Sequence, residues 1–213
     1  VDIPHFPEGG VFSGKKKRAI KINRSDKFVQ RIFIWGSWDT GGRFYGGWWQ
    51  RLPGKWRQRI RINDEPVAEL DYSGLHIVML YAIEGIDYWK DVGTDPYQLG
   101  QGYESSERMR DLLKLVLLTI INAKTQEKAI KAVRWEVNKN PNEFGWVKDE
   151  GLKLEEIVER FQECHEKISR HFSSGMGVAL QNSDSHMAEL VIKEFTSREI
   201  LILCVRDSFV IQS

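Results

Sequence analysis

The stretch ELDYSGLH (residues 69–76), followed by the apolar run IVMLY (77–81), decides how the rest of the chain is interpreted. Val67 to Leu70 has the composition of a β-strand end, and Ser73-Gly74 that of a turn. From Leu75 onward, apolar residues recur at helical spacing. Asp71 is therefore expected at the tip of a strand, where a carboxylate can hold a divalent cation. The alternative is that Asp71 only caps the following helix.

Composition limits the class of protein. The chain has 213 residues, 41% of them hydrophobic, which suits one domain or one domain with a small extension. No apolar run approaches the roughly 20 residues that a membrane span needs, and the first residues do not resemble a signal peptide. Cys164 and Cys204 stand in patterns typical of buried residues. We therefore expect a cytoplasmic protein with no membrane contact and no disulfide framework.

Charge is distributed unevenly along the chain. Residues 1–62 carry 14 Lys and Arg against four Asp and Glu, a net +10, whereas the remainder carries 17 against 26, a net −9. The basic part includes the tract Lys15–Arg18, followed by Lys21, Arg24 and Lys27. Such an arm can follow a phosphate backbone, and the alternative is a solvated tail.

A segment rich in glycine and tryptophan, Gly36–Gln50, follows a predicted strand at Phe28–Trp35. Glycines let a backbone approach a ligand closely, and Arg43 among aromatic residues offers charge and stacking surfaces to nucleic acid. The alternative is a Gly-Trp corner that packs on the core. The alternation of basic and apolar residues from Arg57 to Ile62 predicts another strand.

The middle of the chain is predicted to be helical. After a loop at Gly93–Tyr97, Ser105 or Ser106 can cap a helix that ends near Ile121. Arg110 and Lys114 lie four residues apart on one face of this helix, where two cations can hold an anion between them. The pattern predicts two further helices, at Gln126–Val137 and Leu152–Phe172.

The end of the chain carries the second carboxylate of interest. A loop from Val178 to His186, a helix at Met187–Phe195 and a buried strand at Ile200–Val205 are predicted before it. Asp207 then stands in a tight turn ahead of a returning strand. Apolar sequence on both sides of Asp207 favours a buried carboxylate at the tip of a β-hairpin. The alternative is that Asp207 only forms the turn.

In this order the features resemble the palm of the DNA polymerase I family (family A) and its relatives, the phage-type single-subunit RNA polymerases. Six segments carry the resemblance. They are Gly41-Gly42-Arg43 with the arginine-rich strand after it, Asp71-Tyr72-Ser73, Asp95-Pro96-Tyr97, Arg110 with Lys114, Leu180-Gln181, and Val205-Arg206-Asp207-Ser208.

The resemblance implies nucleotidyl transfer with two metal ions. Asp71 and Asp207 would hold two Mg²⁺ ions, for which Mn²⁺ can substitute, and the backbone carbonyl of Tyr72 would complete one of the sites. Arg110 and Lys114 would neutralise the triphosphate of the incoming nucleotide.

The remaining motifs would serve the nucleic acid. By the same resemblance, Arg43 and Gln181 would contact the primer-template near its growing end, and Asp95 would support the site.

Three positions depart from the pattern of the family. Asn122 stands where the fingers helix usually carries an aromatic ring, and an amide cannot stack on a base pair. His76 stands where the DNA polymerases carry a Glu that excludes the ribose 2′-hydroxyl. Asn122 and His76 are therefore the candidates for sugar selection. Arg206 replaces the histidine of the catalytic hairpin.

The predicted fold is α+β: a right-hand polymerase palm whose antiparallel sheet carries Asp71 and Asp207. The sheet would be backed by helices including Leu152–Phe172, with reduced fingers and a minimal or absent thumb. Residues 1–40 would form a basic arm and the first strand, and residues 41–213 the palm, with fingers at about 104–150.

The predicted activity is template-directed synthesis from nucleoside triphosphates on a DNA primer-template, with DNA favoured over RNA. An accessory chain could supply a thumb or processivity. The alternatives are a primase or an untemplated terminal transferase on the same palm, and a nucleic-acid-binding module without catalytic activity.

Overall fold

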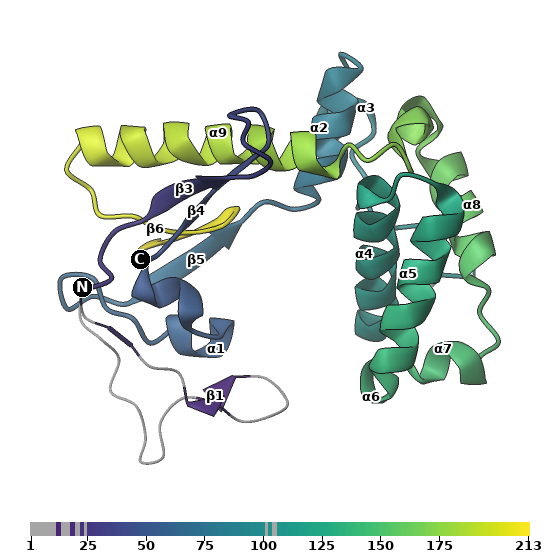
Figure 1. Ribbon diagram of the computed structural model, residues 1–213, viewed down its shortest axis with the longest axis horizontal. Coiled ribbons are helices and arrows are strands. Elements are labelled where there is room, and N and C mark those ends of the chain that lie inside the picture. Colours follow the sequence, from purple (N-terminus) through teal and green to yellow (C-terminus); the bar gives the residue numbers. More distant parts are fainter. Residues whose placement is uncertain (1–11, 14–17, 20–21, 24, 101, 104–105) are drawn as a thin grey trace. The chain divides into compact units, whose positions relative to one another are not determined.

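The computed structural model describes residues 12–13, 18–19, 22–23, 25–100, 102–103 and 106–213 (Figure 1). The chain divides into two compact units, unit 1 (Val1–Ser73 with Gln181–Ser213) and unit 2 (Gly74–Leu180). Helices and antiparallel strands occupy separate segments, so the fold class is α+β, as predicted. The division differs from the predicted boundary after residue 40, because strands from both ends of the chain build one sheet.

Unit 1 contains two short hairpins and a three-stranded sheet. β1 (Phe12–Ser13) pairs with β2 (Arg18–Ala19), and β3 (Gln30–Phe33) pairs with β4 (Gly41–Tyr45). The three-stranded antiparallel sheet has the order β5 (Val67–Asp71), β7 (Ser208–Gln212), β6 (Leu203–Val205). The helical elements of this unit are η1 (Trp48–Arg51), α1 (Gly54–Arg57) and, from Gln181 onward, α9 (Gly177–Ser197).

The two faces of the three-stranded sheet pack against different partners. On one face, Val210 and Leu203 pack with the cluster formed by Trp48, Trp49 and Leu52. On the other face, Phe209 packs with Ala188 of α9, which Figure 1 shows as the long helix beside β3 and β4. α9 thus packs on this sheet, whereas the segment Leu152–Phe172, predicted to back it, contributes to the core of unit 2.

α9 corrects a second prediction. The segment Val178–His186 was expected to be a loop because Asn, Ser and Asp favour turns, yet α9 runs unbroken from Gly177 to Ser197. Its polar side chains find partners in the rest of unit 1: Asn182 Nδ2 donates to Trp38 O at 3.0 Å, and Asp184 accepts from Arg43. These tertiary contacts outweigh the local preference for a turn.

Two strand predictions in unit 1 need correction. Arg57–Ile62 is no strand: Arg57 ends α1, and Ile62 makes an isolated β-bridge with Glu65. The segment Gly36–Gln50, rich in glycine and tryptophan, contains β4 and the start of η1. The last strand pair is shorter at its start than predicted, because β6 begins at Leu203, and Ile200 and Leu201 are exposed.

Unit 2 is helical. Its main helices are α2 (Leu75–Ile83), α4 (Glu107–Asn122), α5 (Gln126–Lys139) and α8 (Leu154–Cys164). The short elements are α3 (Tyr88–Asp91), α6 (Pro141–Phe144), α7 (Trp146–Asp149) and η2 (Glu166–His171). α4 and α5 confirm the predicted helices, and Ser106 caps α4 by accepting a hydrogen bond from Met109 N at 3.2 Å. Ser105 lies outside the described residues.

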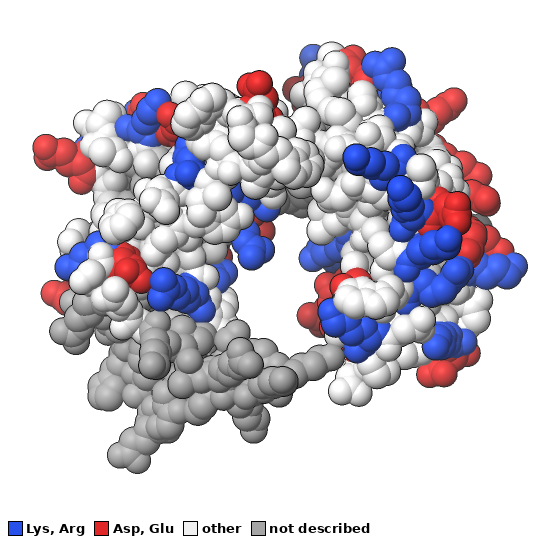
Figure 2. Space-filling model, in the orientation of Figure 1, with Lys and Arg blue, Asp and Glu red and all other residues white. Residues whose placement is uncertain are grey.

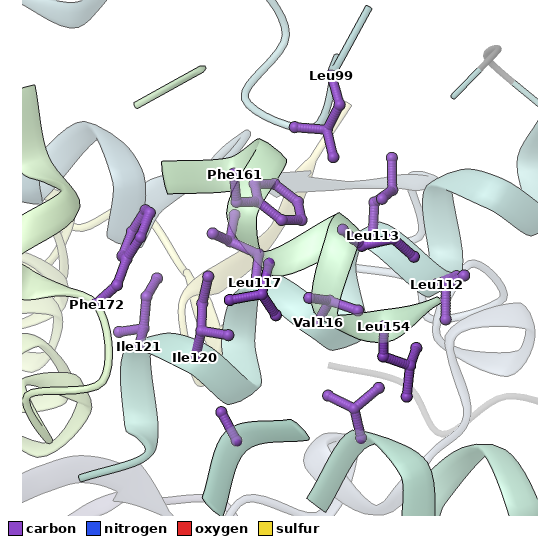
Figure 3. Close-up of a cluster of buried hydrophobic side chains, with 14 of the residues drawn as sticks. Leu99, Leu112, Leu113, Val116, Leu117, Ile120, Ile121, Leu154, Phe161 and Phe172 are labelled. Carbon is purple, nitrogen blue, oxygen red and sulfur yellow. The ribbon is translucent and has the colours of Figure 1, made fainter. Parts of the chain in front are cut away.

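The core of unit 2 forms where α4, α5 and α8 meet (Figure 3). Leu113, Val116 and Leu117 of α4 are almost fully buried, together with Phe161 of α8. The apolar stripe of α4 at i, i+3 and i+4 therefore faces this core, as its sequence predicted.

The predicted helix Leu152–Phe172 is shorter than expected. It ends at Cys164, and a 3₁₀-helix follows. The ring of His165 at this break is buried and forms hydrogen bonds with Tyr81 Oη at 3.2 Å and Pro96 O at 3.0 Å. Cys164 is exposed, contrary to prediction, whereas Cys204 is buried.

The surface carries both signs of charge. Figure 2 shows Lys and Arg interspersed with Asp and Glu over the helices of unit 2. Most of the predicted basic tract, including Lys15–Lys17, Lys21 and Arg24, lies outside the described residues. None of the helices in the described ranges has the length and apolar content that crossing a membrane requires.

Candidate active site

Asp71 and Asp207 lie beside each other in unit 1. β5 pairs with β7 so that Asp71 is directly opposite Ser208, the residue that follows Asp207. Residues opposite each other on antiparallel strands have Cα atoms about 4.5–5.5 Å apart. Both aspartates line one pocket of about 380 Å³, together with Tyr45, Gln50, Arg57, Glu69, Val205, Arg206 and Ser208.

The donor atoms of this pocket suit a hard divalent cation. Carboxylate oxygens are the ligands that Mg²⁺ takes from proteins, and it commonly uses one or two carboxylates plus substrate phosphates and water. Within the described part of the chain, no group of three or more His, Cys, Asp or Glu side chains is arranged to hold a metal. Asp71 and Asp207 contribute two carboxylates to the lining of the pocket.

The turn that carries Asp207 is strained and tightly held. It joins β6 to β7, with Val205 opposite Ser208, and Arg206 has a φ of 60°, which a residue other than glycine adopts at a cost. The Cys204 thiol donates to Arg206 O at 3.3 Å. Burial, and then the charges of Asp207 and Asp184, raise the pKa of this thiol to about 12, so it stays protonated as a donor.

Asp207 itself is less buried than the sequence predicted. Its side chain is 39% exposed, because the turn projects beyond the apolar strands on either side. A carboxylate at such a position keeps access to solvent and to ligands.

A half-buried ion pair lines the pocket. Arg57 donates from Nε and Nη2 to the two carboxylate oxygens of Glu69, at 2.9 and 2.6 Å. Ser208 Oγ lies 3.1 Å from Glu69 Oε1 and can donate to it. Because Glu69 and Ser208 flank Asp71 and Asp207, this network ties α1 to both strands that carry the aspartates.

Arg43 also points toward the turn. Its Nη2 lies 2.6 Å from Asp184 Oδ2 and 4.0 Å from Asp207 Oδ2. Burial alone would lower the pKa of Arg43, but the hydrogen bond to Asp184 and the charges of Asp184 and Asp207 raise it. Arg43, predicted to contact primer-template, is thus held mainly by a buried carboxylate.

The other residues predicted around the aspartates are dispersed. Gln181 is half-buried in α9, where its carbonyl accepts a hydrogen bond from Ser185 Oγ. Tyr72 is 46% exposed, and with Asp71 it lines a second pocket of about 210 Å³ on the side of the sheet that packs against α9.

Unit 2 brings the predicted triphosphate ligands together. Arg110 forms an ion pair with Asp95, and its guanidinium carbon lies 4.9 Å from the centre of the Tyr97 ring. Lys114 Nζ lies 6.0 Å from the same ring. Asp95, Tyr97 and Arg110 line a pocket of about 200 Å³, so the motif Asp95-Pro96-Tyr97 and the start of α4 form one cluster.

The two sugar-selection candidates also lie in unit 2. His76 is half-buried in the first turn of α2. Asn122 ends α4, where its Nδ2 donates to Leu118 O at 2.7 Å. A Cβ atom at Gly177 would lie 1.8 Å from Asn122 Oδ1, so the amide packs against the glycine that begins α9.

Two residues of the site were assigned no role from the sequence. Glu69 stands two residues before Asp71 on one strand, hence on the same face, and this alternation could have identified it. Asp184 meets Arg43 across 141 positions of sequence. No local pattern signals such a contact.

Comparison with known proteins gives no further assignment, because no protein family, curated protein or solved structure matches this chain.

Proposed function

We propose that the chain is a nucleotidyltransferase that adds nucleotides from nucleoside triphosphates to the 3′-hydroxyl of a nucleic-acid primer. The observation that carries the proposal is the pairing of Asp71 with Ser208, since it lets Asp71 and Asp207 line one pocket. The order of six motifs, which resembles that of the family A palm, supports the same function.

The two carboxylates would act as ligands of Mg²⁺ or Mn²⁺, with the backbone carbonyl of Tyr72 as a further donor. Bound metal supplies an acidified primer hydroxyl and a neutralised leaving pyrophosphate. The protein's own contribution is to keep the carboxylates in register. The β5–β7 ladder fixes the backbone, and the Arg57–Glu69 pair with Ser208 braces both strands.

Arg110 and Lys114 would bind the phosphates of the incoming nucleotide. In the structure Arg110 is paired with Asp95. A triphosphate carries more negative charge than one carboxylate and accepts bidentate hydrogen bonds from Arg, so it would compete with Asp95 for the guanidinium. Asp95 would thus hold Arg110 in an extended position before the nucleotide binds.

The remaining assignments follow the resemblance. The proposed substrate is a DNA primer-template contacted by Arg43 and Gln181, with RNA as the alternative and with His76 and Asn122 influencing the choice of sugar. The proposed setting is cytoplasmic, and an accessory chain would supply a thumb or processivity.

Primer extension tests the proposal. Wild type, Asp71→Asn and Asp207→Asn are incubated with labelled primer-template and Mg²⁺, and dNTPs and NTPs are offered separately. Asp64→Asn serves as the matched control, since Asp64 is exposed in unit 1 and lines no pocket with the two aspartates. We expect template-dependent extension by wild type and Asp64→Asn, and a loss of at least about a thousandfold in both active-site variants.

Each other outcome identifies an alternative. Extension that ignores the template sequence would indicate a terminal transferase. Bound primer-template without extension by wild type would indicate a binding module. Extension that persists in Asp207→Asn would refute the assignment of the carboxylates.

A further inference from the structure

The guanidinium of Arg43 stands between two carboxylates of unequal environment. Nη2 of Arg43 lies 2.6 Å from Asp184 Oδ2, and Nε lies 3.5 Å from Asp184 Oδ1. The same Nη2 lies 4.0 Å from Asp207 Oδ2. The side chain of Asp184 is 1% exposed, that of Arg43 15% and that of Asp207 39%.

This arrangement matters because a cation near a metal ligand competes with the metal. A guanidinium that paired fully with Asp207 would occupy the carboxylate oxygens that a divalent cation needs. Burial strengthens such competition, since charges attract more strongly where water is excluded. Asp184, whose side chain is 1% exposed, compensates the charge of Arg43 inside the protein.

We propose that Asp184 is a positioning residue that holds Arg43 away from Asp207 and so keeps Asp207 available to a divalent cation. This role rests on the proposed function, since it concerns the affinity of the same carboxylates for metal. It assigns a purpose to a buried carboxylate that is not among the residues lining the Asp71–Asp207 pocket.

Removing the charge of Asp184 has a specific consequence. Asn at position 184 keeps the size of the side chain and one hydrogen-bond acceptor, but it removes the negative charge nearest to the largely buried guanidinium of Arg43. Asp207 is then the carboxylate within reach, and pairing with it relieves the unbalanced charge. Divalent cations must afterwards displace a guanidinium from Asp207.

Mn²⁺ binding to the full chain tests this role of Asp184. Binding is measured by electron paramagnetic resonance, as the decrease in the signal of free Mn²⁺. The variants are Asp184→Asn, Arg43→Gln and the double variant Asp184→Asn/Arg43→Gln, and Asp207→Asn defines binding that does not depend on the site. Thermal unfolding of each variant checks that it is folded.

Glu189→Gln is the matched control. Glu189 lies on the same helix, α9, and its carboxylate pairs with Arg31 at 2.6 Å, as Asp184 pairs with Arg43. The replacement breaks an ion pair of the same length, but Arg31 forms no ion pair with Asp207 in the described part of the chain, so Mn²⁺ affinity should not change.

We expect Asp184→Asn to bind Mn²⁺ about tenfold more weakly than wild type. The double variant should regain affinity at or above that of wild type, although it has lost both partners. Recovery of Mn²⁺ affinity in the double variant would identify Arg43 as the group that blocks Asp207 in Asp184→Asn. Thermal unfolding of the same variants measures any coupled change in stability, which residues in contact commonly show.

Two results would overturn the role of Asp184. Unchanged affinity in Asp184→Asn, or a double variant as weak as Asp184→Asn, would refute it while leaving the metal site intact. Wild type without Asp207-dependent Mn²⁺ binding would instead remove the proposed metal site, and the role of Asp184 with it.

Discussion

At Glu69, one carboxylate accepts hydrogen bonds from two elements that flank the Asp71–Asp207 pocket. Arg57 of α1 donates twice, and Ser208 at the start of β7 lies 3.1 Å away. The side chains of Arg57 and Glu69 are 17% and 21% exposed. Removing one charge therefore leaves the other without its ion-pair partner in a largely buried position.

We therefore expect Glu69→Ala to lower the free energy of unfolding by about 2 kcal/mol, measured by urea titration. The control is Glu127→Ala, which breaks a pair of equal length with Lys131 whose side chains are 76% and 69% exposed. Glu127→Ala should lower the free energy of unfolding by much less than Glu69→Ala does. Equal effects of the two variants would contradict the bracing role of Glu69.

His165 gives unit 2 a dependence on pH. Burial lowers the pKa of His165 below its ordinary 6.5, although its hydrogen bond to Pro96 O opposes the shift. Below pH 6.5 the imidazole of His165 therefore binds a proton more readily in the unfolded chain than in the folded chain, so acid favours unfolding.

We expect the stability of wild type to be greatest above pH 6.5 and to fall as the pH drops toward 5. In His165→Gln this part of the loss should be smaller, because no titrating ring is buried at that position. Urea unfolding at intervals between pH 5 and 8 measures both slopes. Parallel slopes for the two proteins would show that His165 is not responsible.

Some residues of the candidate site could be identified from the sequence and others could not. Asp71 and Asp207 could be singled out because each stands at a strand end in a recognisable motif. Arg43 could be identified as unusual, but its partner Asp184 could not, since that contact depends on how α9 packs on β4. The exposure of Asp207 was also missed, because apolar neighbours in sequence do not show that a turn projects outward.

The start of α2 depends on a glycine. Gly74 has a φ of +62°, and a Cβ atom there would lie 2.5 Å from Pro96 Cγ. Gly85, just past the same helix, has a φ of +73° with nothing within 4 Å of such an atom. Alanine at either position would therefore have a strained backbone, and at position 74 it would also clash with Pro96.

Gly85→Ala should cost about 1 kcal/mol of stability through strain alone. Gly74→Ala should cost roughly 2–3 kcal/mol, because Pro96 must also shift. Thermal or urea unfolding measures the difference. A cost for Gly74→Ala no greater than that for Gly85→Ala would contradict the close approach of Pro96.

Elements with strong internal signals were predictable. α4 and α5 have capping residues and an apolar stripe, and β5 alternates before a small-residue turn. The failures share a cause in tertiary contacts. α9 continues through Asn182–Ser185 because groups distant in sequence form hydrogen bonds with Asn182 and Asp184. Arg57 ends a helix rather than starting a strand, and its guanidinium forms hydrogen bonds with Glu69.

At the scale of the whole molecule, the uneven charge predicts electrostatic binding of nucleic acid. Residues 1–62 carry a net charge of +10, and Lys15, Lys16 and Lys17 stand together there. Replacing these three lysines by Gln should reduce the slope of log affinity against log salt by about two to three on duplex DNA.

Fluorescence anisotropy at several salt concentrations measures this slope. The control replaces Lys131, Lys139 and Lys148 by Gln, which removes the same charge from the helices of unit 2. Similar slopes for the two triple variants would show that binding is governed by net charge and not by the basic arm.

The division into two units could not be read from the sequence. A boundary after residue 40 was expected because the resemblance to the polymerase palm begins at Gly41, whereas unit 1 joins the two ends of the chain through the pairing of β5 with β7. That pairing joins positions about 140 residues apart along the sequence. The fold class was predictable because it depends only on the kinds of element present.

The most direct test of the account is anomalous diffraction from crystals of the protein grown with Mn²⁺. The account predicts manganese bound between the carboxylates of Asp71 and Asp207, with oxygen ligands from both at about 2.1–2.2 Å. Manganese bound elsewhere, or carboxylates of Asp71 and Asp207 that point away from each other, would contradict the proposal that these two strands form a nucleotidyl-transfer site.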